Sequence, residues 1–319
     1  MGRHLWSQVE KIVFLTEQMR VTDQAYLNFL NRLRAGECTD EDMLMLSERV
    51  IGNFPGDTPS FENNVIICPG NELVMQINDM FATQHSETKK VFVTTANDTH
   101  DKKRLPKKFA ESIKNLSATN RSGIPRELRM FVGMPVCVSK NQYVELGITN
   151  GATGVIKEIH LRNGRHITED TGFHHVKFKD TDCIILQMDN VKVQPLDGLE
   201  RNFVPIYPDK GYFGVRVKGK TDKVNVATHH FPIVPRFSCT SHKAQGQTLS
   251  KAIVDLVRPE GNKSNALSFA YVPLSRVRRL EDLTILRDFD PKFVKGLRPL
   301  PGCIEMIEHF KTKDLAKDL

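Results

Sequence analysis

The stretch Val65-Ile66-Ile67-Cys68-Pro69-Gly70-Asn71 decides the fold class. Four apolar residues in a row are typical of a strand buried on both faces. Pro69-Gly70 then turns the chain, and Asn71 can cap a following helix. That helix has one apolar face, made of Leu73, Val74, Ile77, Met80 and Phe81. A buried strand followed at once by an amphipathic helix predicts a parallel α/β layer.

Segments on both sides of this stretch extend the α/β pattern. Residues 252–257 and 283–286 are two further apolar runs of strand length, and residues 264–280 between them are predicted to be largely helical. Toward the amino terminus, apolar residues recur with helical spacing from Asp23 to Arg34, and Gly36 is placed to end that helix. Thr39 then offers a side-chain cap for a second helix.

The middle of the chain has a different texture. Short strands are predicted at residues 176–178, 184–186 and 191–193, and Asn150-Gly151 is a strong turn dipeptide. Such strands favour a small barrel or a sandwich. We therefore expect an α/β unit interrupted by a β-rich insertion. The expected division is 1–85, then a basic linker or accessory segment 86–130, the β-rich insertion 131–232, and the remainder of the α/β unit, 233–319.

Composition narrows the class of protein. The chain has 319 residues and a formal charge of +7, with 45 Lys and Arg against 38 Asp and Glu. This is a globular balance, and no apolar run is long enough to span a membrane. Six cysteines lie far apart, which favours buried thiols in a reducing compartment. The histidine pairs 174–175 and 229–230 lack ligands at metal-binding spacing, so no metal site is predicted.

A basic segment lies between the two textures. Residues 102–129 contain nine Lys and Arg and only two acids. A solvated loop explains such a segment, and so does contact with phosphates. Binding of single-stranded nucleic acid would also need exposed aromatic residues on which bases can stack. For each aromatic candidate, however, packing in the core is the first expectation. The candidates are Tyr143, Phe173, Tyr207, Tyr212 and Phe213.

Two clusters of polar residues are the candidates for binding phosphate groups or for catalysis. The first is Cys239-Thr240-Ser241-His242-Lys243-Ala244-Gln245-Gly246-Gln247-Thr248, whose hydroxyl, imidazole and ammonium groups suit phosphate oxygens. The second is Tyr271-Val272-Pro273-Leu274-Ser275-Arg276-Val277-Arg278-Arg279. An arginine in such a cluster can stabilise charge in phosphoryl transfer, whereas a solvated basic helix end needs no function at all.

The order and spacing of these clusters resemble the Pif-type DNA helicases (the petite-integration-frequency family), including the helicase portion of Helitron-like elements. Residues 240–248 resemble their motif V, and residues 271–277 resemble motif VI. Residues 15–20 with 30–36 resemble the opening of their second RecA-like domain. Asn71 and Asn78 resemble another element of that domain. Residues 133–138 and 150–154 resemble the β-rich accessory insertion.

The resemblance implies roles for particular residues. Arg20 and Arg276 would reach the γ-phosphate of ATP, Gln245 and Gly246 would lie at the nucleotide, and single-stranded DNA would contact a third group. That group is Thr240, His242 and Lys243. The sequence also departs from the family pattern at three positions. Ser241 replaces an apolar residue, Gly70 replaces Arg, and Pro273 replaces Ala within a predicted helix, which bears on where Arg276 points.

The first RecA-like domain of the family, which holds ATP and Mg²⁺, is expected to lie outside this chain, either upstream or as a separate partner. Gly214-Val215-Arg216-Val217-Lys218-Gly219-Lys220-Thr221 does match a phosphate-loop pattern. A working loop needs a strand before it and a helix after it. Alternating residues on both sides predict a hairpin here instead.

The function expected from the resemblance is the C-terminal portion of an ATP-dependent 5′→3′ DNA helicase with roles in DNA repair and recombination. Its expected location is intracellular, in the nucleus or the mitochondrion of a eukaryote, without a membrane partner. The alternative is a non-enzymatic remnant that binds single-stranded nucleic acid and hydrolyses nothing. An in-frame phosphate-loop domain in the upstream coding sequence would distinguish the two.

Overall fold

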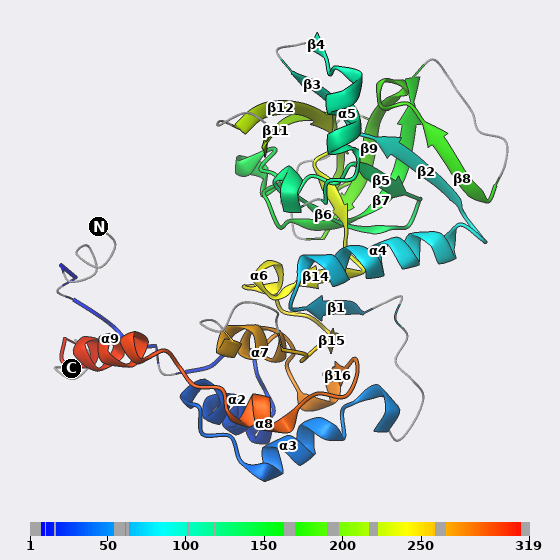
Figure 1. The fold of residues 1–319 in the computed structure, drawn as a ribbon. Helices are drawn as coiled ribbons and strands as arrows, with labels where there is room; N and C mark the ends of the chain where they lie inside the picture. Colours follow the sequence, from blue (N-terminus) through cyan, green and yellow to red (C-terminus); the bar gives the residue numbers. More distant parts are fainter. Residues whose placement is uncertain are drawn as a thin grey trace. The chain divides into compact units, whose positions relative to one another are not determined.

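The computed structural model describes residues 8–9, 11–15, 17–53, 61, 64–100, 103–117, 119–162, 170–189, 198–216, 223–258 and 266–313. The chain forms two compact units (Figure 1). The first combines residues 1–70 with 239–319, and the second is residues 71–238. The chain therefore leaves the first unit after Gly70 and returns to it at Cys239.

The first unit is built on a four-stranded sheet in the order β14 (Ser238–Thr240), β1 (Val65–Cys68), β15 (Ala252–Val254), β16 (Leu283–Ile285). The pairs β1–β15 and β15–β16 are parallel. All three residues of β14, β15 and β16 are buried. Apolar runs predicted the burial of β15 and β16, whereas β14, with Ser238 and Thr240 at its ends, was not among the predicted strands. The boundary between the two units falls inside β14.

Helices complete the first unit. They are α2 (Gln24–Ala35), α3 (Asp40–Ser47), α6 (Ser241–Ala244), α7 (Ala266–Leu274), α8 (Pro291–Lys295) and α9 (Pro301–Lys311), with 3₁₀ turns η1 (Ile51–Asn53) and η6 (Leu280–Asp282). The apolar face of α2, with Tyr26, Phe29, Leu30 and Leu33, lies in the same core as the sheet and α7. The helix predicted over 264–280 is shorter, because the chain turns after Leu274.

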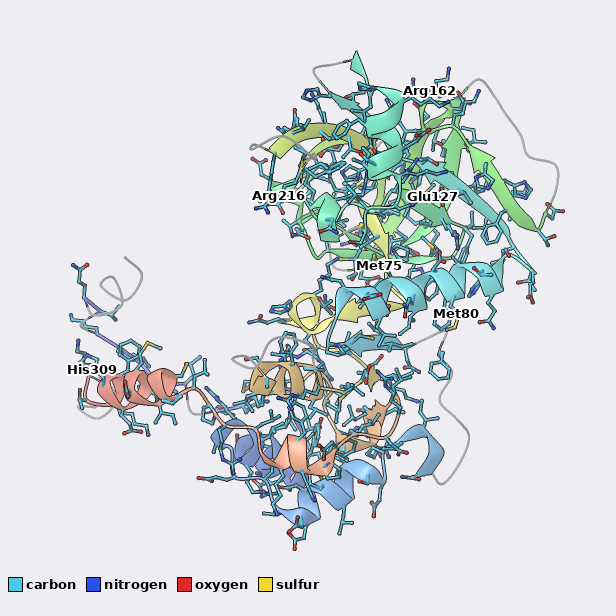
Figure 2. The ribbon with its side chains drawn as sticks, in the orientation of Figure 1. Met75, Met80, Glu127, Arg162, Arg216 and His309 are labelled. Atoms are coloured by element: carbon cyan, nitrogen blue, oxygen red, sulfur yellow. The ribbon has the colours of Figure 1, made fainter. Side chains whose placement is uncertain are left out.

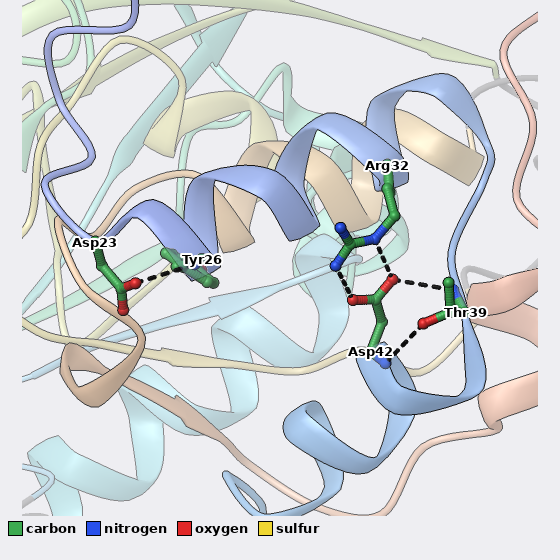
Figure 3. Close-up of polar contacts among 5 residues, drawn as sticks. All are labelled: Asp23, Tyr26, Arg32, Thr39 and Asp42. Carbon is green, nitrogen blue, oxygen red and sulfur yellow. Dashed lines mark hydrogen bonds and ion pairs between the residues drawn. The ribbon is translucent and has the colours of Figure 1, made fainter.

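The corner between α2 and α3 follows its capping residues (Figure 3). The Asp23 side chain accepts from the Tyr26 amide, and Gly36 ends α2 in the left-handed conformation with φ 78°. Thr39 and Asp42 form a reciprocal capping box at the start of α3. Asp42 also receives two hydrogen bonds from Arg32, one of them from Nε at 2.9 Å. The predicted helix end at Gly36 and the predicted cap at Thr39 are confirmed, whereas Asn71 is the first residue of α4 (Asn71–His85).

The second unit begins with α4 (Asn71–His85) and contains three sheets. The largest has the order β10 (Phe203–Ile206), β9 (Thr181–Met188), β7 (Thr153–Leu161), β6 (Pro135–Val138), β13 (Ile233–Pro235). The next is β11 (Asp209–Arg216), β12 (Lys223–His230), β3 (Asn97–His100), β4 (Lys103–Arg104). The third is β5 (Glu127–Met130), β2 (Lys90–Thr95), β8 (Gly172–Val176).

Short helices connect these strands: α5 (Lys107–Lys114), η2 (Thr119–Arg121), η3 (Val144–Leu146) and η5 (Phe178–Asp180). The β-rich texture of the middle of the chain is confirmed. The strand predicted at 184–186 lies within β9, but no strand covers 176–178, because β8 ends at Val176 and Phe178 begins η5. Residues 191–193 lie outside the described part. Strands β11 and β12 pair antiparallel from Asp209↔His230 to Arg216↔Lys223. Residues 214–216 of the phosphate-loop match therefore lie on a strand of an antiparallel hairpin, as predicted, and residues 217–222 lie outside the described part.

The basic segment differs from a solvated loop. It forms β4, α5, η2 and β5, and Arg121 is fully buried. The Arg121 guanidinium donates to both carboxylate oxygens of Asp98, at 2.9 and 2.8 Å, and lies 4.4 Å from the ring centroid of Phe213. The buried Arg121 charge is tolerated because the Asp98 carboxylate pairs with it and accepts its hydrogen bonds.

The aromatic candidates also differ from the expected core packing. Only Phe213 is buried, at 2% exposure. Tyr143, Phe173, Tyr207 and Tyr212 are between 40% and 53% exposed. Alternation along short strands cannot decide which face of a small sheet is covered, because both faces carry mixed residues.

We expect Asp42→Asn to lower the free energy of unfolding by about 1–2 kcal/mol, because the charge-assisted pair with Arg32 is lost and one acceptor oxygen is left for both Arg32 and the Thr39 amide. Burial alone would raise the pKa of Asp42, but hydrogen bonds from Arg32 and the Thr39 amide outweigh it and lower that pKa. The stabilisation is therefore full above the unfolded pKa of about 4 and is lost as the pH falls through the folded-state pKa. Urea denaturation at pH 7 and pH 3 measures both effects. Asp40→Asn, at a carboxylate 81% exposed, is the control and should cost under about 0.5 kcal/mol.

We expect Asp98→Ala to destabilise the second unit by about 3–5 kcal/mol, because it leaves the Arg121 charge buried without a partner. The matched control is Asp79→Ala. This change removes the carboxylate that pairs with Arg129, and that carboxylate is 60% exposed. That change should cost less than about 1 kcal/mol. Equal losses in urea denaturation would contradict the buried placement of Arg121.

Candidate functional site

Arg276 lies just after the carboxyl end of α7. Its Nε donates to the carbonyl oxygen of Val272 at 2.7 Å, and its other two nitrogens donate to Ser275 Oγ at 2.6 Å and to the Gln247 carbonyl at 3.2 Å. The residue is 7% exposed. The helix end and the turn at 247 therefore hold this guanidinium from two sides.

Arg20 reaches the same place from the segment that precedes α2. Its Nε donates to Thr248 Oγ1 at 2.9 Å, and its NH1 donates to the Ser275 carbonyl at 3.1 Å. Ser275 thus holds one arginine with its side chain and the other with its backbone. Likewise, the backbone carbonyl of Gln247 accepts from Arg276, and the side-chain hydroxyl of the next residue, Thr248, accepts from Arg20. The structure brings together the two arginines that the sequence singled out, although they are far apart along the chain.

The electrostatics of this arginine pair are unusual. Burial lowers the pKa of Arg276, and the nearby charge of Arg20 lowers it further. Every acceptor named above is a neutral carbonyl or hydroxyl. Within the described ranges, no carboxylate lies at ion-pairing distance from either guanidinium. Two adjacent cations without a counter-charge form a site that favours an anion.

The turn after α6 carries the two residues predicted to lie at a nucleotide. Gln245 and Gly246 are exposed, and Gly246 adopts φ 83°, a left-handed conformation that suits glycine. The turn is tied to the arginine by two backbone contacts. Besides the Gln247 carbonyl, the Leu249 amide donates to the Arg276 carbonyl at 2.9 Å. Gln245 and Gly246 therefore precede the residues that touch the arginines, at Gln247 and Thr248.

The predicted strand-binding residues lie on β14 and α6 with different exposures. Thr240 is 8% exposed, whereas His242 and Lys243 are exposed. His242 packs edge-on against Phe269 with ring centroids 5.4 Å apart. Ser241, the departure from the family pattern, is buried, and its hydroxyl has no hydrogen-bond partner among the described residues. Only His242 and Lys243 of the three present open side chains.

Pro273 does not remove Arg276 from the site. Helix α7 runs to Leu274 with Pro273 inside it, and the Ser275 amide still reaches the Tyr271 carbonyl at 2.9 Å. The Tyr26 hydroxyl donates to the Leu274 carbonyl and so fastens the end of α7 to α2. Sequence reasoning missed Tyr26 and Ser275. The signal for Ser275 was present, since it stands inside the quoted motif next to Arg276.

Asn78 has a structural place in the second unit. Its Oδ1 accepts from the Ser238 amide at 2.9 Å, and the Ser238 hydroxyl donates to the Val74 carbonyl at the same distance.

Asp255, the single acid after β15, is 2% exposed and binds Arg287 through both carboxylate oxygens. In the described part of the chain, no three His, Cys, Asp or Glu residues gather to hold a metal ion.

The cysteines follow the prediction of buried thiols at five of six positions, since Cys303 alone is exposed. Burial raises the pKa of Cys68 to about 12 and that of Cys38 to about 11. Among the described helices, none has the length and apolar character to cross a membrane.

Comparison with known proteins agrees with the family resemblance seen in the motifs. No family model matches the chain. The ATP-dependent DNA helicase PIF1 of Rattus norvegicus is 25% identical over 283 residues, and that of Mus musculus is 25% identical over 304 residues. These matches cover 88% and 95% of this chain. The resemblance to the Pif-type helicases is confirmed.

The chain spans only part of these relatives, 36% of the rat Pif1 and 37% of the mouse Pif1. Solved Pif1 structures share its fold. Candida albicans Pif1 helicase has a TM-score of 0.62 at 20% identity, with 93% of this chain and 60% of that one covered. Bacteroides Pif1 bound to single-stranded DNA has a TM-score of 0.63 at 20% identity, with 95% and 57% covered. The mixed α/β fold therefore matches that of Pif1 helicases.

We expect inorganic pyrophosphate to raise the melting temperature of the chain, because it supplies the negative charge that no described residue offers the arginine pair. At ten times its dissociation constant an anion adds about 1.4 kcal/mol to stability. Differential scanning fluorimetry at matched ionic strength measures the shift. The double variant Arg20→Met/Arg276→Met should lose it. Arg278→Met, which removes an exposed arginine, should keep it, and an undiminished shift in the double variant would contradict the anion site.

Proposed function

We propose that this chain is the arginine side of the motor of a Pif-type, ATP-dependent 5′→3′ DNA helicase. In this proposal the first unit is the second RecA-like domain, and residues 71–238 include the β-rich small-barrel accessory insertion. The observation that carries the proposal is the arginine pair around Ser275, in which Arg276 is buried and the acceptors among the described residues are all neutral. A motif match alone would not require the two cations to meet.

The chemistry assigned to the pair is charge stabilisation. Phosphoryl transfer spreads negative charge over the equatorial oxygens, and a correctly aimed guanidinium stabilises that charge more than the ground state. Both guanidiniums donate to Ser275, Arg20 to its carbonyl oxygen and Arg276 to its hydroxyl oxygen, so both can approach one terminal phosphate. ATP fits because its terminal phosphate supplies the missing anion. A first RecA-like domain, upstream or separate, would hold most of ATP and Mg²⁺.

The nucleotide and the strand would use neighbouring residues of motif V. Gln245 and Gly246, exposed on the turn before Gln247, would lie beside the nucleotide. His242 and Lys243 would contact the phosphates of single-stranded DNA, and Thr240, buried at the N-cap position of α6, would lie next to them. A Bacteroides Pif1 has been solved with ADP-AlF3 and single-stranded DNA, at 22% identity and a TM-score of 0.58. We extend both ligands to this chain only as part of this proposal.

The test joins this chain to a Pif-type first RecA-like domain, fused or in trans, and measures ATP hydrolysis with single-stranded DNA. We expect Arg276→Ala to reduce turnover by about 10³-fold or more with little change in nucleotide binding. Arg276→Lys should rescue poorly, because a point charge lacks the guanidinium fork. Arg20→Ala should resemble Arg276→Ala. Arg278→Ala is the matched control and should retain activity.

Two outcomes count against the proposal. Full ATPase activity after removal of both arginines would end their assignment to the γ-phosphate. An equal loss in the Arg278 control would show that general positive charge, rather than the held pair, is responsible.

A further inference from the structure

The sheet β11–β12–β3 has two faces of different chemistry. Its inner face carries Phe213 and Val226, both buried in a small core, and Asp98, which pairs with Arg121. Asp209 has the same strand parity and pairs with Lys140. The carboxylates of these strands are thus on the inner side and already have cationic partners.

The outer face has the opposite character. Along β11 the outward positions are Lys210, Tyr212, Gly214 and Arg216. The residues opposite them on β12 are His229, Ala227, Asn225 and Lys223. Asn97 and Thr99 of β3 continue two of these rows. None of these outward positions on the described strands is occupied by an acid.

The end of this face places two cations against each other. Arg216, which is labelled in Figure 2, lies directly opposite Lys223 in the strand pair, and both residues are exposed. Like charges directly opposite destabilise a strand pair. For the described residues, Arg216, Lys223 and Lys210 have no carboxylate at ion-pairing distance. A hairpin optimised only for folding would place an acid at one of these positions.

An exposed aromatic ring lies between the cations. Tyr212 is 53% exposed, and the ammonium of Lys210 lies 5.1 Å from its ring centroid. From Lys210 to Arg216 the strand extends about 20 Å at about 3.4 Å per residue. A row of cations with an open aromatic ring between them is the chemistry that binds single-stranded nucleic acid, where phosphates meet the charges and a base stacks on the ring.

We propose that the outer face of β11 and β12 is a binding site for single-stranded nucleic acid, with Tyr212 as the stacking platform. This outer-face site is composed of Lys210, Tyr212, Arg216 and Lys223, and it is separate from the residues assigned to the strand in the first unit. It holds whether or not the arginine pair serves ATP hydrolysis. Phosphate contacts give it no dependence on base sequence.

The experiment measures binding of the whole chain to a fluorescent 20-nucleotide oligo-dT by anisotropy, over a series of salt concentrations. Each lost phosphate contact lowers the slope of log affinity against log salt by about 0.7 for a single strand. We expect Arg216→Ala/Lys223→Ala to lower that slope by about 1.4 and to weaken binding about tenfold or more at low salt. Tyr212→Ala should weaken binding by about fivefold or more, and Tyr212→Phe should preserve it.

Control variants and a direct contact complete the test. Lys177→Ala/Lys179→Ala removes two exposed lysines of the same unit and should change neither slope nor affinity. Photocrosslinking with 5-iodouracil oligonucleotides should label Tyr212, identified by mass spectrometry. Unchanged binding in both outer-face variants overturns the inference, even if Lys243→Ala weakens binding and so supports the strand contact assigned to the first unit. Binding of the parent chain to phosphatidylserine vesicles but not to the oligonucleotide also overturns it.

Discussion

Two guanidinium groups meet around Ser275, and no described residue offers either of them a carboxylate, so the end of α7 and the turn at Gln247 must hold two like charges together. The carboxyl end of α7 supplies carbonyl oxygens to both arginines, and the turn at Gln247 and Thr248 supplies the rest. Tyr26 fastens that helix end to α2. Neutral acceptors can orient a guanidinium without neutralising it. The site therefore keeps its positive charge available while its geometry is already fixed.

The sequence was informative wherever short-range chemistry decided the outcome. The strand at Val65–Cys68, the cap at Thr39 and the antiparallel pairing of β11 with β12 follow from neighbouring residues, and all were predicted. The arginine pair was reached through motif resemblance, because no local rule links Arg20 to Arg276. Thr240 shows the limit of that route, since its place in the motif gave no warning that the side chain is buried.

Long-range contacts explain what could not be predicted. Arg121 stands in a run of basic residues that looks solvated, and only the distant Asp98 and Phe213 make its burial tolerable. Tyr212 and Phe213 are adjacent in sequence and lie on opposite faces of one strand, so one is open and the other is core. Which face is covered depends on α5 and the neighbouring strands. The residue pattern alone shows that side chains alternate between the two faces of a strand, but it does not show which of the two faces is buried.

The central claim is that both arginines leave neutral acceptors for one terminal phosphate. The most direct measurement is a crystal structure of this chain joined to a Pif-type first RecA-like domain, with ADP and aluminium fluoride bound. The account predicts that the guanidiniums of Arg20 and Arg276 both donate to the fluoride group, with Ser275 still beside them. A structure in which both arginines remain on Val272, Thr248 and Ser275 while the nucleotide is bound elsewhere would contradict it.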